Sequence, residues 1–343
     1  MRLGASSRRG ILTGGTWCAD HNKLVSHWPS EEEVVEILSN DIRGGGSACN
    51  LAVDMKRLDA DLPVSTIGVV GDDEDGQFLL SEADSVGIER SGLVVAKNGL
   101  TAHTDAFTSK ASGQRTHLYI PGTAAELTPD KFDFSETTAR ILHLGLPGVH
   151  PRMDTAWGAD PNGWVTVLRE AKQSGIVTNL ELCSISADRI AELVRPCLAH
   201  LDLLIVNDFE IAAIAGLAAE GVTNMDTHHC VEAARAIFEA GSMQLVVAHF
   251  PDGAVAVSED GNEYLIPSVS VPSDAIQGTN GAGDAFAAGL LYGLHDDMDI
   301  TDALRLGHAA AAASMRGLGT TDTMVSWREC LEMANNWGWR DTI

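Results

Sequence analysis

Short apolar runs alternate with amphipathic stretches along most of the chain, and this alternation restricts the fold more than any other feature. The stretches 163–173 and 231–240 carry apolar residues at helical spacing. The apolar runs have the length of buried strands and occupy 65–70, 141–146, 175–180, 201–206 and 245–248. Strands that alternate with helices form a mainly parallel sheet covered on both faces. The sequence therefore predicts an α/β fold, a three-layer α/β/α sandwich.

Two segments interrupt this alternation. Segment 23–43 is compatible with either a short helix or a strand, because 31–38 mixes glutamates with apolar residues. Segment 103–120 is typical of a hairpin, with strands on either side of a turn at 111–114. We expect these strands to form a small separate sheet. The tryptophan-rich end of the chain, about 320–343, favours a docked helix, and residues 1–343 fit one large domain.

The charge of the chain excludes some partners. The formal net charge is −25 over 343 residues, which repels nucleic-acid phosphates and anionic membrane surfaces. No apolar run approaches the length of about 18 residues that a membrane span needs, and no signal-like apolar segment follows the basic start. Six scattered cysteines without a C-x-x-C pair indicate reduced thiols. We expect a cytoplasmic enzyme, with neither nucleic acid nor membrane as a partner.

The run Gly-Thr-Asn-Gly-Ala-Gly-Asp-Ala-Phe-Ala-Ala-Gly at 278–289 carries the strongest chemical signal. Its small residues let backbone N–H groups converge where a helix begins, and a helix N-terminus attracts anions. Asp284 would then lie where it can take a proton from an incoming hydroxyl group, as phosphoryl transfer requires. From local chemistry alone, Asp284 as a simple helix cap is an equally good interpretation.

Other nucleotide-site motifs are excluded. A dinucleotide-binding fingerprint would need glycine where Phe286 stands, and only about 60 residues follow, too few for the rest of such a domain. There is no G-x-x-x-x-G-K-[ST] loop and no G-x-S-x-G elbow.

Further runs accompany this motif upstream. The run 45–52 is Gly-Gly-Ser-Ala-Cys-Asn-Leu-Ala, and 207–210 fits an N-x-x-E pattern. The remaining matches are 67–76, 113–116 and 121–124. In this order, over about residues 11 to 320, the runs resemble the signatures of the ribokinase-like (PfkB) carbohydrate kinases. The resemblance implies a ribokinase-like fold with a small β lid, and an ATP-dependent kinase acting on a hydroxyl group of a small sugar or sugar acid.

The resemblance also implies residue roles. Asp284 would be the catalytic base beside an anion hole at Gly281, Ala282 and Gly283. The substrate-binding residues would be Asp20, Gly45, Gly46, Asn50 and Arg115. The ATP-binding residues would be Asn207, Glu210, His249, Gly253, Thr279, Gly281, Gly283 and His308. Glu210 would order Mg²⁺ through water, the lid would comprise approximately 21–43 and 100–121, and lids of this kind often mediate homodimers.

Some positions depart from the family pattern. Gly278 stands where an aspartate associated with a monovalent-cation site is usual, so potassium activation is not implied here. Glu181 begins the segment that replaces D-P-N, and 248–253 replaces the nucleotide-binding T-x-G. His249 and His308 are therefore either nucleotide contacts or structural histidines, and Arg115 is either a substrate contact or a lid salt bridge. His228 and His229, in an expected loop, are assigned no metal.

Two alternatives to a sugar kinase remain. The motifs at 45–50 and 279–284 also resemble those of adenosine kinases, although only Trp17, Phe107 and Tyr119 are obvious candidates to sandwich a base. A non-catalytic sugar-binding regulator on the same fold is the other alternative, and loss of the base would be its mark.

Overall fold

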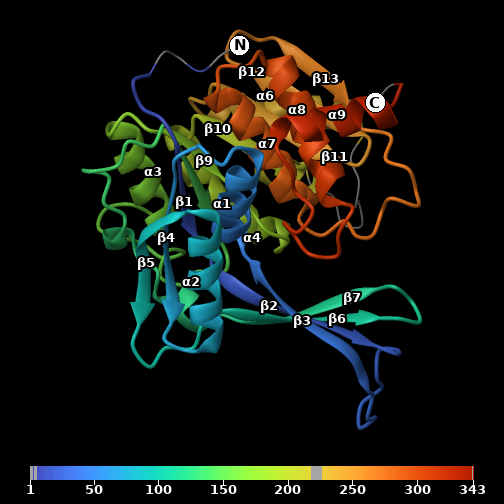
Figure 1. Cartoon of the computed structure of the whole chain (residues 1–343). Helices are drawn as coiled ribbons and strands as arrows, with labels where there is room; N and C mark the ends of the chain where they lie inside the picture. Colours follow the sequence, from blue (N-terminus) through green and yellow to red (C-terminus); the bar gives the residue numbers. More distant parts are fainter. Residues whose placement is uncertain (1–2, 4–5, 218–225, 342) are drawn as a thin grey trace.

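The structure is a computed structural model that describes residues 3, 6–217, 226–341 and 343. Within these ranges the chain folds around a nine-stranded sheet of order β13-β12-β11-β10-β9-β8-β1-β4-β5 (Figure 1). Its strands are β1 Ile11–Gly15, β4 Val64–Gly71, β5 Glu89–Ala96, β8 Ile141–Gly145, β9 Val177–Leu180, β10 Leu203–Asn207, β11 Leu245–Phe250, β12 Gly253–Ser258 and β13 Glu263–Pro267. The pairs from β5 to β11 are parallel, and β12 runs antiparallel to both its neighbours. The predicted parallel sheet is confirmed.

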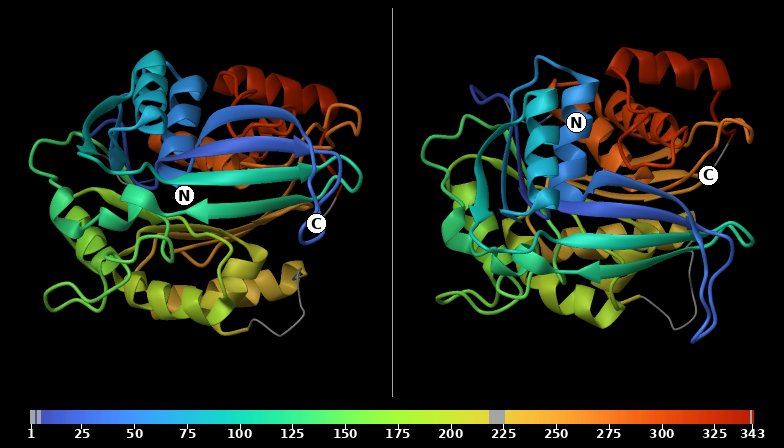
Figure 2. Two further views of the ribbon diagram at one scale, coloured as in Figure 1. Left: turned by 90° about the horizontal axis from the view of Figure 1, so that it is seen from below. Right: turned by 60° about the horizontal axis from the view of Figure 1, so that its bottom comes forward.

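Helices cover both faces of this sheet, which explains why its inner strands are buried on both sides (Figure 2). One face carries α1 Ser47–Leu58, α2 Glu74–Val86, α7 Ala282–His295, α8 Ile300–Ser314 and α9 Trp327–Trp337. The other carries α3 Gly163–Gln173, α4 Ala187–Val194, α5 Asp208–Ala215 and α6 Thr227–Ala240. Short 3₁₀ helices lie at Gly122–Glu126, Pro129–Lys131 and Arg195–His200. The three-layer sandwich is confirmed, as is the docked C-terminal helix.

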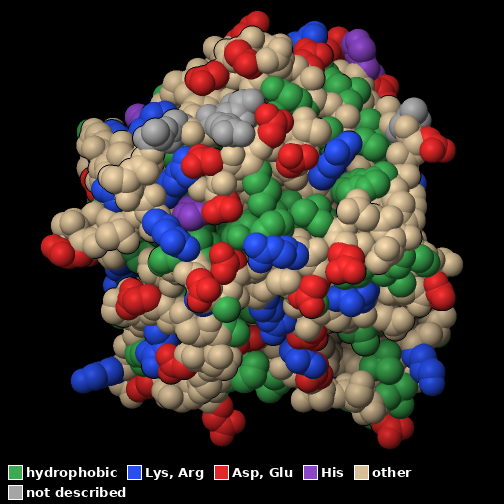
Figure 3. All heavy atoms as spheres, turned by 45° about the horizontal axis from the view of Figure 1, so that its top comes forward, with side chains coloured by type: hydrophobic (Ala, Val, Ile, Leu, Met, Phe, Trp, Pro, Cys, Tyr) green, Lys and Arg blue, Asp and Glu red, His purple; other side chains and the backbone are tan. Residues whose placement is uncertain are grey.

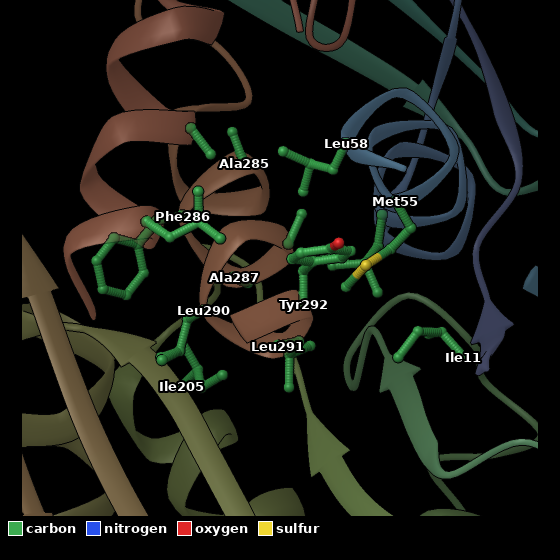
Figure 4. Close-up of a cluster of buried hydrophobic side chains, with 14 of the residues drawn as sticks. Ile11, Met55, Leu58, Ile205, Ala285, Phe286, Ala287, Leu290, Leu291 and Tyr292 are labelled. Carbon is green, nitrogen blue, oxygen red and sulfur yellow. The ribbon is translucent and has the colours of Figure 1, made fainter. Parts of the chain in front are cut away.

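Close packing fixes α7, the helix that carries the acidic motif. Figure 4 shows Phe286 and Leu290 of α7 in the apolar layer that also holds Met55 of α1 and Ile205 of β10. On its other side α7 lies directly against α8, where a Cβ on Gly289 would come within 2.5 Å of the Leu306 carbonyl oxygen. Since interiors of this density leave little room for movement, the start of α7 is held firmly relative to the sheet.

A second sheet, of order β3-β2-β6-β7, projects away from the core (Figure 1). Its strands are β2 Cys18–Val25, β3 Ile37–Gly45, β6 His103–Ser109 and β7 Arg115–Ile120. The hairpin predicted at 103–120 is confirmed by the antiparallel pair β6–β7. The ambiguous segment 23–43 contributes strands and no helix, and it pairs with β6 through β2. We call this second sheet the lid.

Other expectations from the sequence can be compared with the described part of the chain. All six cysteines are free thiols. His228 and His229 lie in the first turn of α6 and not in a loop, because Asp226 caps that helix one turn earlier than expected. No helix in the described ranges is both long and apolar enough to span a membrane. On the face in Figure 3, acidic and basic side chains are interspersed and form no continuous basic patch.

Candidate active site

Two cavities adjoin at the carboxyl ends of the parallel strands. The first has a volume of about 450 Å³ and extends from the lid to the start of α7. The second, about 550 Å³, continues from there between α7, α8 and β11. Ser184, Asn207, His249 and Gly283 line both cavities. Since ligands of α/β proteins bind at this edge of the sheet, the two cavities form the candidate active site.

Asp284 lines the first cavity from the first turn of α7. The N-cap of this helix is Gly281. Glycine is required there because φ is 76° and because a Cβ would lie 2.7 Å from the Thr320 carbonyl oxygen. Asp284 is the third helical residue, and Asn50 Nδ2 donates a hydrogen bond of 2.6 Å to its Oδ2. The helix-cap interpretation is therefore wrong, because the carboxyl group contacts another helix and not the backbone of its own.

The predicted anion hole coincides with the N-terminus of α7. A glycine cap offers no side-chain acceptor, so the first N–H groups of the helix keep their capacity to bind an anion. Ala282 N–H makes only a long bond of 3.3 Å to the Thr279 carbonyl oxygen. Gly283 approaches the His249 ring so closely that a Cβ would lie 3.3 Å from it. These N–H groups lie where the two cavities meet.

Of the predicted substrate residues of the lid and α1, Asp20, Gly46 and Asn50 line the first cavity, and Gly45 lies against Asp20 without lining it. Asp20 on β2 packs directly over Gly45 on β3, where a Cβ would lie 2.5 Å from Asp20 Oδ2. Gly46, with φ of 86°, caps α1. Both polar atoms of the Asn50 amide are hydrogen-bonded, because Nδ2 donates to Asp284 and Oδ1 accepts a hydrogen bond of 3.0 Å from Thr320 Oγ1. Burial raises the pKa of Asp20 to about 6, although hydrogen bonding from Thr104 opposes the shift.

Arg115 is not among the residues lining either cavity. Its guanidinium group donates to Asn22 Oδ1 within the lid and acts electrostatically on Asp20. Burial lowers its pKa, so it is not the exposed lid salt bridge that the sequence also allowed. The lid side chains that do line the first cavity from β7 are His117 and Tyr119, of which His117 was not predicted.

Asn207 and Glu210 form a capping box at the start of α5. Asn207 Oδ1 accepts from the Glu210 N–H at 2.8 Å, and Glu210 Oε2 accepts from the Asn207 N–H at 3.0 Å. Burial, reinforced by the charges of Asp284 and Asp208, raises the pKa of Glu210 to about 7. Both residues line the first cavity, so the N-x-x-E pattern is located at the site.

The second cavity holds most of the remaining predicted nucleotide residues. His249 pairs in register with Asn207 across β11 and β10, and its ring lies 4.9 Å from that of Phe286. Phe286 lies 4.9 Å from His308, whose buried Nε2 has no hydrogen-bond partner in the described part of the chain. Thr279 also lines this cavity. Gly253 is not among the residues lining either cavity; it allows close packing of β12, and its contact with the nucleotide stays a prediction.

Glu181, which the sequence marked only as a departure from the family pattern, and two residues that the sequence did not single out, His143 and Asn179, extend the site behind Asp284. Glu181, directly after β9, lines the first cavity, and its Oε2 accepts a hydrogen bond from Nε2 of the fully buried His143. Asn179 Nδ2 donates to His143 Nδ1 at 3.0 Å. A histidine within an apolar strand resembles an ordinary core residue, and no signal in the sequence links it to a glutamate in another strand.

Comparisons with known proteins agree with this architecture. The sequence model described as pfkB family carbohydrate kinase matches residues 15–327. The 5-dehydro-2-deoxygluconokinase of Clostridium perfringens is 28% identical over 278 residues, covering 78% of this chain and 77% of the relative. The ATP-dependent ribose-1-phosphate kinase of Halopiger xanaduensis is 28% identical over 302 residues, covering 88% and 90%. The crystal structure of ribokinase from Thermotoga maritima superimposes with a TM-score of 0.76 at 20% identity, covering 96% and 99%.

Proposed function

The chain belongs to the pfkB family of carbohydrate kinases, and from this premise we propose that it transfers the γ-phosphoryl group of Mg-ATP to a hydroxyl group of a small sugar or sugar acid, with Asp284 as the general base. The family acts on sugar hydroxyls, so the enzyme is a phosphotransferase with an alcohol group as acceptor. The proposal concerns the donor, the metal ion and the role of each residue. The observation that carries it is the position of Asp284, directly after the Gly283 that lines both cavities.

The second cavity suits the nucleotide. Phe286, Val269 and Ile276 provide apolar walls for a purine, and the unpartnered Nε2 of His308 offers a polar contact within them. Phosphates that extend toward the first cavity would reach Thr279 and the N–H groups at the start of α7. The positive end of that helix favours a phosphoryl group that gains negative charge during transfer.

The residues present fit magnesium that arrives with the nucleotide. Within the described ranges, no group of three or more His, Cys, Asp and Glu side chains could enclose a metal ion. Mg²⁺ commonly keeps several waters and binds through phosphates and one or two carboxylates, so such a cage is not required. Glu210 would hold the hydrated ion, with Asn207 on the phosphate side. When bound, the ion neutralises phosphate charge. Gly278 has no side-chain oxygen for a monovalent cation, and we propose none.

The first cavity suits a polyhydroxylated acceptor. Asp20 accepts hydrogen bonds from sugar hydroxyls, whereas Asn50 both donates and accepts. Asp284 takes the hydroxyl proton as the sugar oxygen bonds to the γ-phosphorus and the bond from that phosphorus to the ADP oxygen breaks. Closure of the lid over this cavity would exclude water that otherwise hydrolyses ATP.

The positions of the aromatic side chains favour a sugar over a nucleoside as the phosphate acceptor. Trp17 is fully buried and donates to Thr66 Oγ1 at 2.8 Å, so it cannot stack on a base. Phe107 packs against Trp28 and does not line the first cavity, which leaves Tyr119 alone of the three candidates. A nucleoside base would therefore lack the aromatic sandwich that the alternative requires.

The exposed apolar side chains of the lid support a homodimer. Ile37 on β3 and Leu118 on β7 are 47% and 54% exposed, and Ile42 and Ile120 are exposed as well. Apolar side chains gathered on one sheet favour association with a second copy. Light scattering of the purified protein tests this, and a monomer at all concentrations would contradict it.

The catalytic proposal is tested by following ADP release with sugars, sugar acids and nucleosides as acceptors. We expect turnover with a sugar or sugar acid, and we expect Asp284→Asn to lower kcat by roughly 10²- to 10⁴-fold while ATP binding by calorimetry is retained. Near-normal activity of the variant would exclude Asp284 as the base. Absence of any phosphorylated product over the whole panel would favour the sugar-binding regulator instead.

A further inference from the structure

Asp284 does not face the first cavity alone, because Glu181 lines it as well and the two carboxyl groups lie within hydrogen-bonding reach of each other. Glu181 comes from the end of β9 and Asp284 from the start of α7, so residues about 100 positions apart in the sequence form this contact. Two carboxylates in contact repel each other, and such a pair binds protons as a unit.

The Glu181 carboxyl group is anchored from behind by the sheet. An amide nitrogen can only donate, so the bond from Asn179 Nδ2 makes His143 Nδ1 an acceptor and places the ring hydrogen on Nε2. That Nε2–H donates to Glu181 Oε2. The register of β8 and β9 places His143 directly opposite Asn179. Burial lowers the pKa of His143 to about 4, so the ring is neutral and serves as a fixed donor.

No cation offsets the pair. In the described part of the chain, neither Asp284 nor Glu181 forms a salt bridge with lysine or arginine, whereas Arg115 and Arg57 act on Asp20 and Asp54. The other titratable groups facing the pair are Cys18 and Asp20 of β2, Asp54 of α1, His143 of β8, Cys183 after β9, Glu210 of α5 and His249 of β11. Three of these seven groups, Asp20, Asp54 and Glu210, are carboxyl groups, and the charge of Glu210 adds to burial in raising the pKa of Glu181.

We propose that Glu181, anchored by His143 and Asn179, is a positioning residue that strengthens Asp284 as a base through direct carboxyl–carboxylate contact. This inference rests on the proposed role of Asp284. In the reactive form both groups are ionised, with the Glu181 charge stabilised by the His143 Nε2–H. The acceptor hydroxyl gives its proton to Asp284 as its oxygen bonds to phosphorus, and that proton is then shared with Glu181. Burial and the Glu181 charge both raise the pKa of Asp284, in agreement with this arrangement.

The decisive experiment is the pH profile of kcat/KM for wild type and Glu181→Gln. Glutamine keeps the size of the side chain but removes the charge, so we expect the acid limb to move to lower pH. We also expect kcat on the plateau to fall about tenfold, because a weaker base removes the proton less effectively. His143→Leu removes the donor that stabilises the Glu181 charge, so the doubly ionised pair should form only at higher pH and the limb should move in the opposite direction.

Asp54→Asn is the matched control. Asp54 is a buried carboxyl group whose own pKa is raised by burial and by the Asp284 charge, but it has no hydrogen-bond contact with the pair in the described chain. We expect its profile to match that of wild type. An unchanged limb in Glu181→Gln, or equal shifts in Glu181→Gln and Asp54→Asn, would overturn the proposal.

A second measurement does not depend on activity. The carboxyl ¹³C signal of Asp284, identified by its loss in Asp284→Asn, should titrate at lower pH in Glu181→Gln than in wild type. Identical titration curves would refute the contact. If Asp284→Asn is inactive while Glu181→Gln behaves like wild type, only the pair is refuted; if Asp284→Asn remains active, the proposed function itself fails.

Discussion

Gly45→Ala tests whether the close contact between β3 and β2 positions the substrate-binding carboxylate. The Cβ of alanine would lie 2.5 Å from Asp20 Oδ2, 2.6 Å from Cγ and 2.8 Å from Oδ1. The backbone at Gly45 does not have a positive φ, so alanine can adopt its conformation without strain. The substitution therefore acts on its surroundings, and the group it displaces is the Asp20 carboxylate.

The size of the effect follows from the displacement. Ordinary contact between a methyl carbon and an oxygen requires about 3.4 Å, so the carboxylate must move by roughly 0.9 Å. A hydrogen bond of about 2.8 Å lengthened by that amount no longer qualifies as one. Loss of a hydrogen bond to a charged group costs about 1.5–3 kcal/mol, which corresponds to a rise in KM for the acceptor of roughly 10- to 150-fold.

The assay is a double-mutant cycle on KM with Gly45→Ala, Asp20→Ala and the combined variant. If the methyl group acts through the carboxylate, Gly45→Ala should change KM little in the Asp20→Ala background. The KM for ATP and the melting temperature of each variant control for damage elsewhere. Equal effects of Gly45→Ala in both backgrounds, or a KM within twofold of wild type, would refute the reasoning.

Two pH predictions follow from the raised carboxyl pKa values. With a pKa of about 6, Asp20 loses its acceptor charge as the pH falls below that value, so KM for the acceptor should rise there; an equally steep rise in Asp20→Asn would contradict this. Glu210 has a pKa of about 7 in the native protein against an ordinary value of 4.5, so the unfolded chain releases this proton first and native stability falls as the pH rises between those values. Glu210→Gln can keep the Asn207 cap. Above pH 7 it should therefore raise the free energy of unfolding by on the order of 3 kcal/mol, and below pH 4.5 it should raise it by little. Equal gains in thermal unfolding above and below this range would exclude the linkage.

The sequence predicted the fold where apolar runs and helical periodicity coincide with burial. It did not identify β12 and β13, because β12 is rich in small residues and β13 is a partly exposed edge strand. Segment 23–43 stayed ambiguous because six residues at the start of β3 are exposed, so no alternation of apolar and polar residues marks the strand. Its structure is determined by pairing with β2, a contact that local sequence does not reveal.

Glycine motifs in the sequence predicted residues of the candidate site better than single histidines did. Gly45, Gly46 and Gly281 are each required by a close approach or a positive φ, and such requirements leave a recognisable pattern in the sequence. The close approach at Gly253 serves packing of β12, so a glycine pattern by itself does not distinguish packing from ligand binding. His143 could not be found, since its role depends on the register of two strands.

The charges around the first cavity indicate where the attraction for phosphate must originate. Its lining includes the carboxyl groups of Asp20, Glu181, Glu210 and Asp284 and contains no lysine or arginine among the described residues. A cavity of this kind repels a triphosphate. The N–H groups at the start of α7, where Gly283 lies, are the attractive element that the protein itself provides at the junction. The same negative charge that repels phosphate raises the proton affinity of Asp284. The acidity of the cavity therefore favours removal of the hydroxyl proton, while attraction of the donor is left to the helix N-terminus, to Arg340 in the lining of the second cavity and to the cation that accompanies the nucleotide.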